Sequence, residues 1–271
     1  MSSRPPDLAD RWTRAVASIK DGPLRVAYVR SEIARADAAS AARALNDLCA
    51  RAEQADARAR DVLAAAVPSL TDEDLAPRVN ELRALALESA LHPLARLLRK
   101  KKDRPGAPSS REGSPGSSKE APNRAAKAGA RPLTLGERKA LARTLRTKGA
   151  LEKLLADPHP AVVRNLLGNP RITEDDIIRL VARRPASADI LAEIVRHPAW
   201  SQRPRVRMAI LQNPGAPAEI AVPLVRLLVR PELREIAAAA DIAPVVRSAA
   251  VEILARRPPI PEGRGPGEPT Q

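Results

Sequence analysis

One pattern occurs twice in the C-terminal half of this chain, with the two copies 44 residues apart. Leu166–Val181 reads LLGNPRITEDDIIRLV, and Ile210–Val225 reads ILQNPGAPAEIAVPLV. In both copies an Asn-Pro pair separates one apolar run from the next, and the apolar positions keep the same phase. A short unit with a single apolar stripe cannot bury that stripe alone, so neighbouring units must stack on one another. The repetition therefore predicts a stacked array of helices.

A second recurring feature is a proline followed by valine and arginine, which is typical of a helix start. It appears as Pro160–Arg164, as Pro204–Arg207 and as Pro244–Arg247, and the successive arginines are 43 and 40 residues apart. A spacing of about 40–47 residues belongs to helical repeats of the HEAT and armadillo type. Both features together predict one repeat region in the C-terminal half.

The segment Asp157–Arg164 (DPHPAVVR) is followed by Asn169-Pro170 and by the helix start Thr173–Asp176. This order of short segments resembles bacterial HEAT-like repeats, most closely those of the leucine-rich-repeat-variant type. The resemblance covers about residues 133–257 and implies an α-solenoid of about three units that binds a partner rather than catalysing a reaction. The chain departs from the pattern in three ways: Asp-Pro appears once, the third unit lacks Asn-Pro, and Ala188–Arg196 is an additional helix.

The available core residues also favour helices. The chain has no Phe, one Tyr and two Trp among 271 residues, so Ala, Leu, Val and Ile must fill the core. Ala and Leu are strong helix formers, whereas sheets favour aromatic and β-branched residues. No segment shows sustained alternation of polar and apolar residues. We therefore expect an all-α protein whose N-terminal helices cover Leu8–Ile19, Pro23–Ala36, Ala38–Ala55, Asp56–Val67 (ended by Pro68) and Val79–Lys100, with capping-box spacing at Thr71 and Asp74.

Two segments cannot bury enough apolar surface to order themselves, because they are rich in Pro, Gly, Ser and charged residues. They divide the chain into an N-terminal helical domain (1–99), a flexible basic linker (100–131), the HEAT-like repeat domain (132–257) and a disordered tail (258–271). The helices expected in the repeat domain are Leu135–Thr147, Ala150–Ala156, Ala161–Gly168, Glu174–Arg184, Ala188–Arg196, Pro204–Gln212, Ala218–Val229 (kinked by Pro223 or starting late because of it), Glu232–Ala239 and Val245–Arg257.

Glu174, Asp175 and Asp176 are the most conspicuous acidic cluster. Consecutive helical side chains point about 100° apart, so three adjacent carboxylates do not converge on one metal or substrate. Thr173 is a good N-cap with Asp176 three residues later, and acids in a first turn complement the positive end of the helix. We therefore interpret the cluster as a helix start.

Other candidates for chemistry are weak. Each of the three histidines, His92, His159 and His197, precedes a proline, and no His-x-x-x-His pair exists for a zinc site. His159 and His197 lie near the same repeat phase and could still meet. The single cysteine, Cys49, is expected to be a buried thiol. We expect no catalytic residue, cofactor or metal.

The best functional candidates are arginines that crowd one region around a tryptophan. Such a set could bind an acidic protein surface, where Arg and Trp are enriched, or hold phosphates while the indole stacks on a base. A structural alternative is that Arg164, Arg207 and Arg247 join adjacent repeat units to Asp157 or Asp241, and that the tryptophan fills a gap in the core. The candidate partner-binding residues are Arg183, Arg184, Arg196, Trp200, Arg203, Arg205 and Arg207.

The net charge of +14 comes from the linker and the C-terminal half, because residues 1–99 hold 15 basic and 14 acidic residues. No secretory signal is visible, and no apolar run approaches the about 18–20 residues of a membrane-spanning helix. The sequence thus predicts a soluble, cytoplasmic, non-catalytic scaffold or adaptor that binds another protein and no membrane. The alternative is sequence-nonspecific nucleic-acid binding through the basic linker and the Arg-rich C-terminal domain. No feature predicts an oligomeric state.

Overall fold

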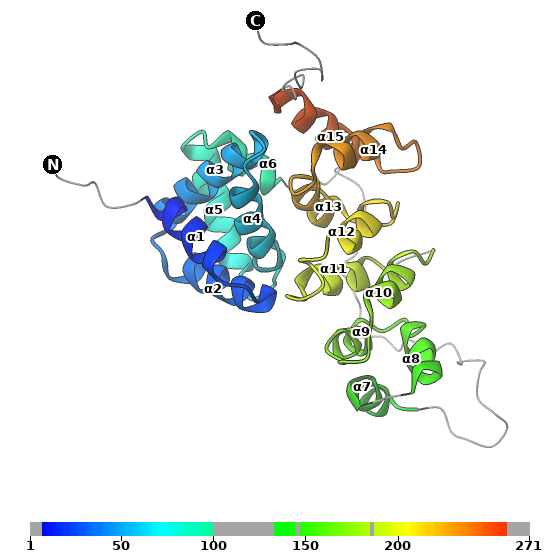
Figure 1. Cartoon of the computed structure of the whole chain (residues 1–271). Coiled ribbons are helices and arrows are strands. Elements are labelled where there is room, and N and C mark those ends of the chain that lie inside the picture. Colours follow the sequence, from blue (N-terminus) through cyan, green and yellow to red (C-terminus); the bar gives the residue numbers. More distant parts are fainter. Residues whose placement is uncertain (1–6, 100–132, 145–146, 185–186, 259–271) are drawn as a thin grey trace, which may run out of the picture.

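The computed structural model describes residues 7–99, 133–144, 147–184 and 187–258. These residues form fifteen α-helices and no strand, so the expected all-α class is confirmed for them (Figure 1). The predicted linker 100–131, and the predicted tail apart from Pro258, lie outside the described residues.

Six helices make up the N-terminal group. They are α1 (Leu8–Ser18), α2 (Gly22–Arg35), α3 (Ala38–Glu53), α4 (Ala57–Leu70), α5 (Ala76–Glu88) and α6 (His92–Leu97). Asp21, Asp37 and Asp56 each cap the helix that follows them, because their carboxylates accept hydrogen bonds from backbone N–H groups of the first turn. These three helices, α2, α3 and α4, therefore begin within one residue of where the sequence predicted.

Helix α4 is the centre of the molecule. Its residues Val62–Leu70 are all buried, although a helix on the surface of a core buries only one face. It packs against α1, α2 and α3 within the N-terminal group and against α11 (Ala188–Arg196) and α13 (Ala218–Val225) on its other side (Figure 1). The alanines Ala64–Ala66 permit this close approach from both sides.

The predicted end of this helix at Val67 is wrong, because α4 continues through Pro68 to Leu70. A proline inside a helix leaves the carbonyl four residues earlier without its donor, and here that carbonyl, on Ala64, accepts a hydrogen bond from Gln202. The predicted capping box at Thr71 is also wrong. Thr71 ends α4, and its hydroxyl donates to the carbonyls of Val67 and Pro68.

The single helix predicted over Val79–Lys100 is in fact two, α5 and α6. The chain breaks at Ala90, which adopts a left-handed conformation with φ 52°, and the N–H of Leu91 returns to the carbonyl of Ala86. The next helix begins at His92 with Pro93 in its first turn. A proline disfavours helical geometry in the residue before it, so the His92-Pro93 pair was the available signal for this break.

Nine helices make up the C-terminal group. They are α7 (Leu135–Thr144), α8 (Lys148–Leu155), α9 (Pro160–Leu167), α10 (Glu174–Val181), α11, α12 (Pro204–Leu211), α13, α14 (Arg230–Ala238) and α15 (Pro244–Arg256). Alternate helices pack on one another: α7 on α9 and α9 on α11, and likewise α8 on α10 and α10 on α12. The expected helix starts at Pro160, Pro204 and Pro244 are confirmed, since these residues begin α9, α12 and α15.

The two copies of the repeated pattern correspond to the turn between α9 and α10 and the turn between α12 and α13. In the first, the Asn169 amide donates to the carbonyl of Ala142 in α7 at 2.8 Å, and its Oδ1 accepts from the N–H of Arg171. In the second, the Asn213 amide donates to the carbonyl of Val181 in α10 at 2.5 Å, and its Oδ1 accepts from Gly215. Both asparagines are buried, so the Asn-Pro pair ties each turn to a helix two positions earlier.

Helix α10 ends at Val181 rather than at the predicted Arg184, and α13 is also shorter than predicted. Helix α13 includes Pro223 and ends at Val225, whereas it was expected to reach Val229. None of the helices in the described ranges has both the length and the apolar character needed to cross a membrane.

Candidate functional site

The acidic cluster at the start of α10 is a helix cap. The Thr173 hydroxyl oxygen accepts from the N–H of Asp176, and the Asp176 carboxylate accepts from the N–H of Thr173 at 3.0 Å, which completes a capping box. Asp175 points to a different side and pairs with Arg205 at 3.0 Å. The interpretation of these acids as a helix start is therefore confirmed.

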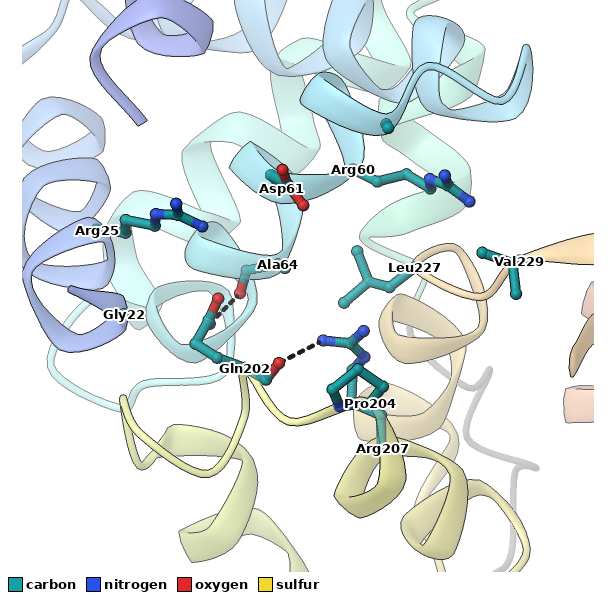
Figure 2. A pocket seen from close by; sticks show the side chains of 11 residues that line it. Gly22, Arg25, Arg60, Asp61, Ala64, Gln202, Pro204, Arg207, Leu227 and Val229 are labelled. Carbon is teal, nitrogen blue, oxygen red and sulfur yellow. Dashed lines mark hydrogen bonds between the residues drawn. The ribbon is translucent and has the colours of Figure 1, made fainter. Parts of the chain in front are cut away.

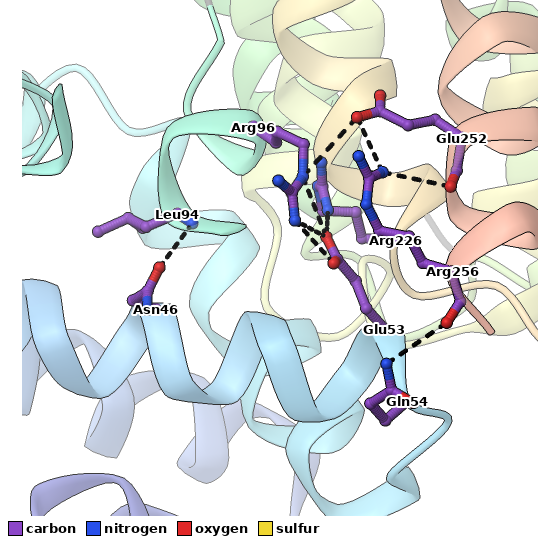
Figure 3. A network of polar contacts seen from close by, with 8 residues as sticks. All are labelled: Asn46, Glu53, Gln54, Leu94, Arg96, Arg226, Glu252 and Arg256. Atoms are coloured by element: carbon purple, nitrogen blue, oxygen red, sulfur yellow. Dashed lines mark hydrogen bonds and ion pairs between the residues drawn. The ribbon is translucent and has the colours of Figure 1, made fainter. Parts of the chain in front are cut away.

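The two helical groups meet in a buried ion-pair network that the sequence did not indicate (Figure 3). Glu53, at the end of α3, is 6% exposed and accepts from Arg96 of α6 at 2.7 Å. The same carboxylate accepts from Arg226, which follows α13 and is 5% exposed. On the outer side of the network, Glu252 of α15 lies 3.8 Å from Arg96 and 2.8 Å from Arg256. One carboxylate thus holds a guanidinium from each group.

A second set of contacts joins the groups along α4. Arg196 of α11 donates to the backbone carbonyl of Thr71 at 2.8 Å and pairs with Glu73 at 3.0 Å. Gln202 donates to the Ala64 carbonyl at 2.9 Å. The N-terminal and C-terminal groups are therefore docked through specific polar contacts as well as through apolar packing.

Beside Gln202 a partly open cavity of about 270 Å³ lies between the two groups (Figure 2). Its wall combines the start of α2, one side of α4, the segment that leads into α12 and the residues after α13. The lining includes three arginines, one aspartate and one glutamine, which are Arg25, Arg60, Arg207, Asp61 and Gln202. Three cations against one carboxylate make the lining of this cavity basic.

The seven predicted partner-binding residues do not form one surface. Arg196 and Arg207 lie between the two helical groups. Arg203 and Arg205 are exposed at the start of α12, where Arg205 meets Asp175 of α10. Arg183 and Arg184 are exposed beyond the other end of α10.

Their contacts differ as well. Arg183 donates to the carbonyl of Leu155 at 2.7 Å, and Arg184 lies 3.8 Å from Asp241. Arg203 makes no side-chain polar contact with any described residue. The arginines that are close in the sequence therefore lie in three places. One pair is at the junction between the groups, one exposed pair is at the start of α12, and the other exposed pair follows the end of α10.

Trp200 is partly buried. Its indole N–H donates to the carbonyl of Leu167 at 2.9 Å, and its ring lies 6.3 Å from the ring of His197. Burial lowers the pKa of His197, so the imidazole is neutral near pH 7. The tryptophan therefore fills the space between α9 and the α11–α12 turn, which agrees with the structural alternative.

The predicted pairing of repeat arginines with Asp157 or Asp241 is wrong. Arg164 pairs instead with Glu193 of α11, its Nε lying 2.6 Å from the carboxylate. Asp157 is paired with Arg138 of α7 at 2.8 Å. The reason is geometric: α9 packs on α7 and α11, so the nearest acids belong to those helices.

The side chains of Cys49 and His159 take part in packing and helix capping. Cys49 is buried in α3, and burial raises the pKa of its thiol to about 12. The His159 ring accepts a hydrogen bond from the N–H of Ala161 and so caps α9. Within the described ranges, no group of three or more His, Cys, Asp or Glu residues is placed to hold a metal ion.

No protein-family model, curated protein or solved structure is detectably similar to this chain. Its function must therefore be argued from its own residues. Sequence reasoning missed Arg25, Arg60 and Glu53, because nothing in the local pattern distinguishes them from solvated residues of an amphipathic helix. The sequence signal for this junction was the consecutive apolar run in α4. A helix that is covered on one side only has polar residues on its other side, so a continuous apolar run indicates a helix that is covered on both sides.

Proposed function

We propose that the protein is a non-catalytic, cytoplasmic scaffold or adaptor that binds another protein along its C-terminal group, which we interpret as a HEAT-like α-solenoid of the leucine-rich-repeat-variant type. The observation that supports the proposal most is the packing of alternate helices, α7 on α9 on α11 and α8 on α10 on α12. Arrays built in this way present long surfaces on which partners dock.

The part of the array that is free to bind is its beginning. The N-terminal group covers α11 and α13 through α4, whereas α7–α10 extend beyond it (Figure 1). The surface of α10 and the turn before it carries Arg171 and Arg179, both exposed, and Arg183 and Arg184 follow the helix. An acidic segment of a partner protein is the chemistry that such a surface fits.

The alternative of nucleic-acid binding has less support. Stacking on a base requires a free aromatic face and edge, and Trp200 is packed against His197 with its N–H committed to Leu167. The exposed arginines also lie at both ends of α10 and α12 rather than along one line that a phosphate backbone could follow.

Site-specific photo-crosslinking in cells tests the proposal. A photoreactive residue at position 171 or 179 is expected to capture one or a few discrete proteins, and the same residue at position 14 or 58, on the N-terminal group, is not. The double variant Arg171→Glu, Arg179→Glu is expected to abolish the capture. Arg14→Glu with Arg58→Glu is the matched control for change of charge. Capture of nucleic acid, or equal capture from both groups, would contradict the proposal.

A further inference from the structure

The cavity between the two helical groups combines residues that are far apart in the sequence. Gly22 and Arg25 come from α2, Arg60 and Asp61 from α4, and Arg207 from α12 (Figure 2). With a volume of about 270 Å³, the cavity is slightly smaller than the about 300–1,000 Å³ that is usual for small-molecule sites. It can therefore accommodate a small ligand but not a folded partner.

The arginines of this cavity lack carboxylate partners, unlike those in the interface network around Glu53. Arg25 donates its Nε to the backbone carbonyl of Ile19 at 2.6 Å. Arg207 donates to the backbone carbonyl of Gln202 at 3.1 Å, and its buried Nε has no partner among the described residues. Arg60 makes no side-chain polar contact within the described part of the chain. All three positive charges are thus uncompensated by an ion pair.

Further positive charge lies close to Arg60, outside the lining of the cavity. Arg257 is buried, donates to the carbonyl of Leu228 at 2.6 Å and leaves its Nε without a partner in the described residues. Arg230 donates to the carbonyl of Arg257. The nearby carboxylate of Glu232 is engaged in accepting from the N–H of Val229 at 2.8 Å. Neutral backbone carbonyls, rather than acids, therefore satisfy these guanidinium groups.

The pKa values of two of these arginines, Arg207 and Arg257, are lowered by this arrangement. Burial lowers the pKa of Arg207, and the attraction of Glu232 and Asp61 offsets this only in part. Burial, together with repulsion from Arg60 and Arg230, lowers the pKa of Arg257 to about 10. Like charges gathered in a partly buried site are destabilising unless an anion joins them.

We propose that this cavity is a binding site for a small phosphorylated anion, of the size of pyrophosphate or of the diphosphate group of a small molecule. Guanidinium groups present paired N–H donors that match phosphate oxygens, which is why arginine predominates in such sites. Arg60 of α4 and Arg207 of α12 contribute charges from opposite sides of the junction between the groups, and Arg60 repels Arg207. A bound anion therefore also strengthens the docking of one group on the other, and this role is separate from the partner surface on α7–α10.

Titration calorimetry of the full-length protein with sodium pyrophosphate, at constant ionic strength in a phosphate-free buffer, tests the site. The expected result is saturable binding of one pyrophosphate per chain, tighter than that of inorganic phosphate, with a rise in thermal stability on binding. Arg60→Gln removes an unpaired charge and is expected to weaken binding about tenfold. Arg58→Gln, an exposed arginine on the same helix outside the cavity, is the matched control and leaves binding unchanged.

A gain of affinity separates the proposal from simple damage to the fold. Asp61→Asn removes the one carboxylate among the described lining residues and is expected to tighten pyrophosphate binding about threefold. Absence of saturable binding, or an equal loss in Arg58→Gln and Arg60→Gln, would overturn the assignment. Tighter binding of a short oligothymidylate than of pyrophosphate, with the same dependence on Arg60, would also overturn it in favour of a nucleic-acid backbone.

Discussion

Gln202 supplies the hydrogen bond that Pro68 cannot make. The ring of Pro68 has no N–H, so the carbonyl of Ala64, four residues earlier in α4, loses its helical donor. The side-chain amide of Gln202 donates to the Ala64 carbonyl instead, at 2.9 Å. Gln202 and Pro68 are 134 positions apart in the chain. A residue of the C-terminal group therefore supplies a hydrogen bond that is missing from a helix of the N-terminal group.

This relationship predicts an interaction energy between Pro68 and Gln202. Gln202→Ala is expected to lower the free energy of unfolding by about 1–2 kcal/mol, because the Ala64 carbonyl is left unpaired. In a Pro68→Ala background the N–H of residue 68 can bond that carbonyl itself, so the same change is expected to cost much less. Urea denaturation of the four proteins of the double-mutant cycle measures the difference. Strictly additive effects would show that the two residues are not coupled.

Loss of the Glu53 carboxylate is expected to destabilise the junction strongly. Glu53→Gln leaves the buried Arg226 without a counter-charge and leaves Arg96 with the more distant Glu252 at 3.8 Å. Removal of one partner from a buried pair costs about 3–5 kcal/mol. Equilibrium urea denaturation measures the loss. Glu81→Gln is the control, because Glu81 forms a half-exposed pair with Arg78 that is worth at most about 1 kcal/mol. Similar effects of the two changes would contradict a structural role for the buried network.

Asn169 and Asn213 are expected to be equally important to the C-terminal group. Replacing either with Ala leaves a helix carbonyl and a turn N–H without a partner, at a cost of about 1–3 kcal/mol. Gln212→Ala is a suitable control, since the side chain of the neighbouring Gln212 is exposed and, among the described residues, bonds to the exposed Glu235. Thermal unfolding of the three variants compares them. A loss in Gln212→Ala as large as that in Asn213→Ala would mean that the turn asparagine has no special part in packing.

The acid sensitivity of the N-terminal group is expected to depend on Glu32. Burial alone would raise the pKa of this carboxyl, but the hydrogen bonds from Arg11 and Trp12 outweigh it, and the net pKa is lowered. The resulting stability is present above the unfolded pKa of about 4.3 and is lost as the pH falls through the lower folded value. Glu32→Gln should therefore be less stable than the natural protein at neutral pH, and the difference should shrink below about pH 4. Urea denaturation across pH 3–7 gives the profile, and a difference independent of pH would refute it.

The Cys49 thiol is expected to be unreactive in the folded protein. Its pKa is raised to about 12 and its side chain is buried, so neither thiolate nor access is available near pH 8. Labelling with a thiol reagent should proceed at the rate of unfolding and become fast in denaturant. Rapid stoichiometric labelling under native conditions would show that α3 opens locally.

The helical class, the helix starts at Pro160, Pro204 and Pro244, and the cap at Thr173 could be predicted because each depends on residues within a few positions. The interface of Glu53 with Arg226 could not, because 173 residues separate them and many charged pairs would have satisfied the sequence equally well. The continuation of α4 past Pro68 was missed for the same reason, since the donor that permits it is Gln202. The partners of Arg164 were predicted wrongly because the repeat phase gives the position of the arginine but not which neighbouring helix offers an acid.

The burial of α4 on both sides has a consequence for synthesis on the ribosome. Helices α1–α3 can cover one side of α4 as soon as they emerge, but α11 and α13 are made more than a hundred residues later. At about 5–20 residues per second, the second side of Val62–Leu70 stays exposed for roughly 8–30 s before α13, which ends at Val225, is available to cover it. During that interval the nascent chain presents an apolar helix face to every molecule nearby, so we expect it to be a binding site for chaperones that hold unfinished chains.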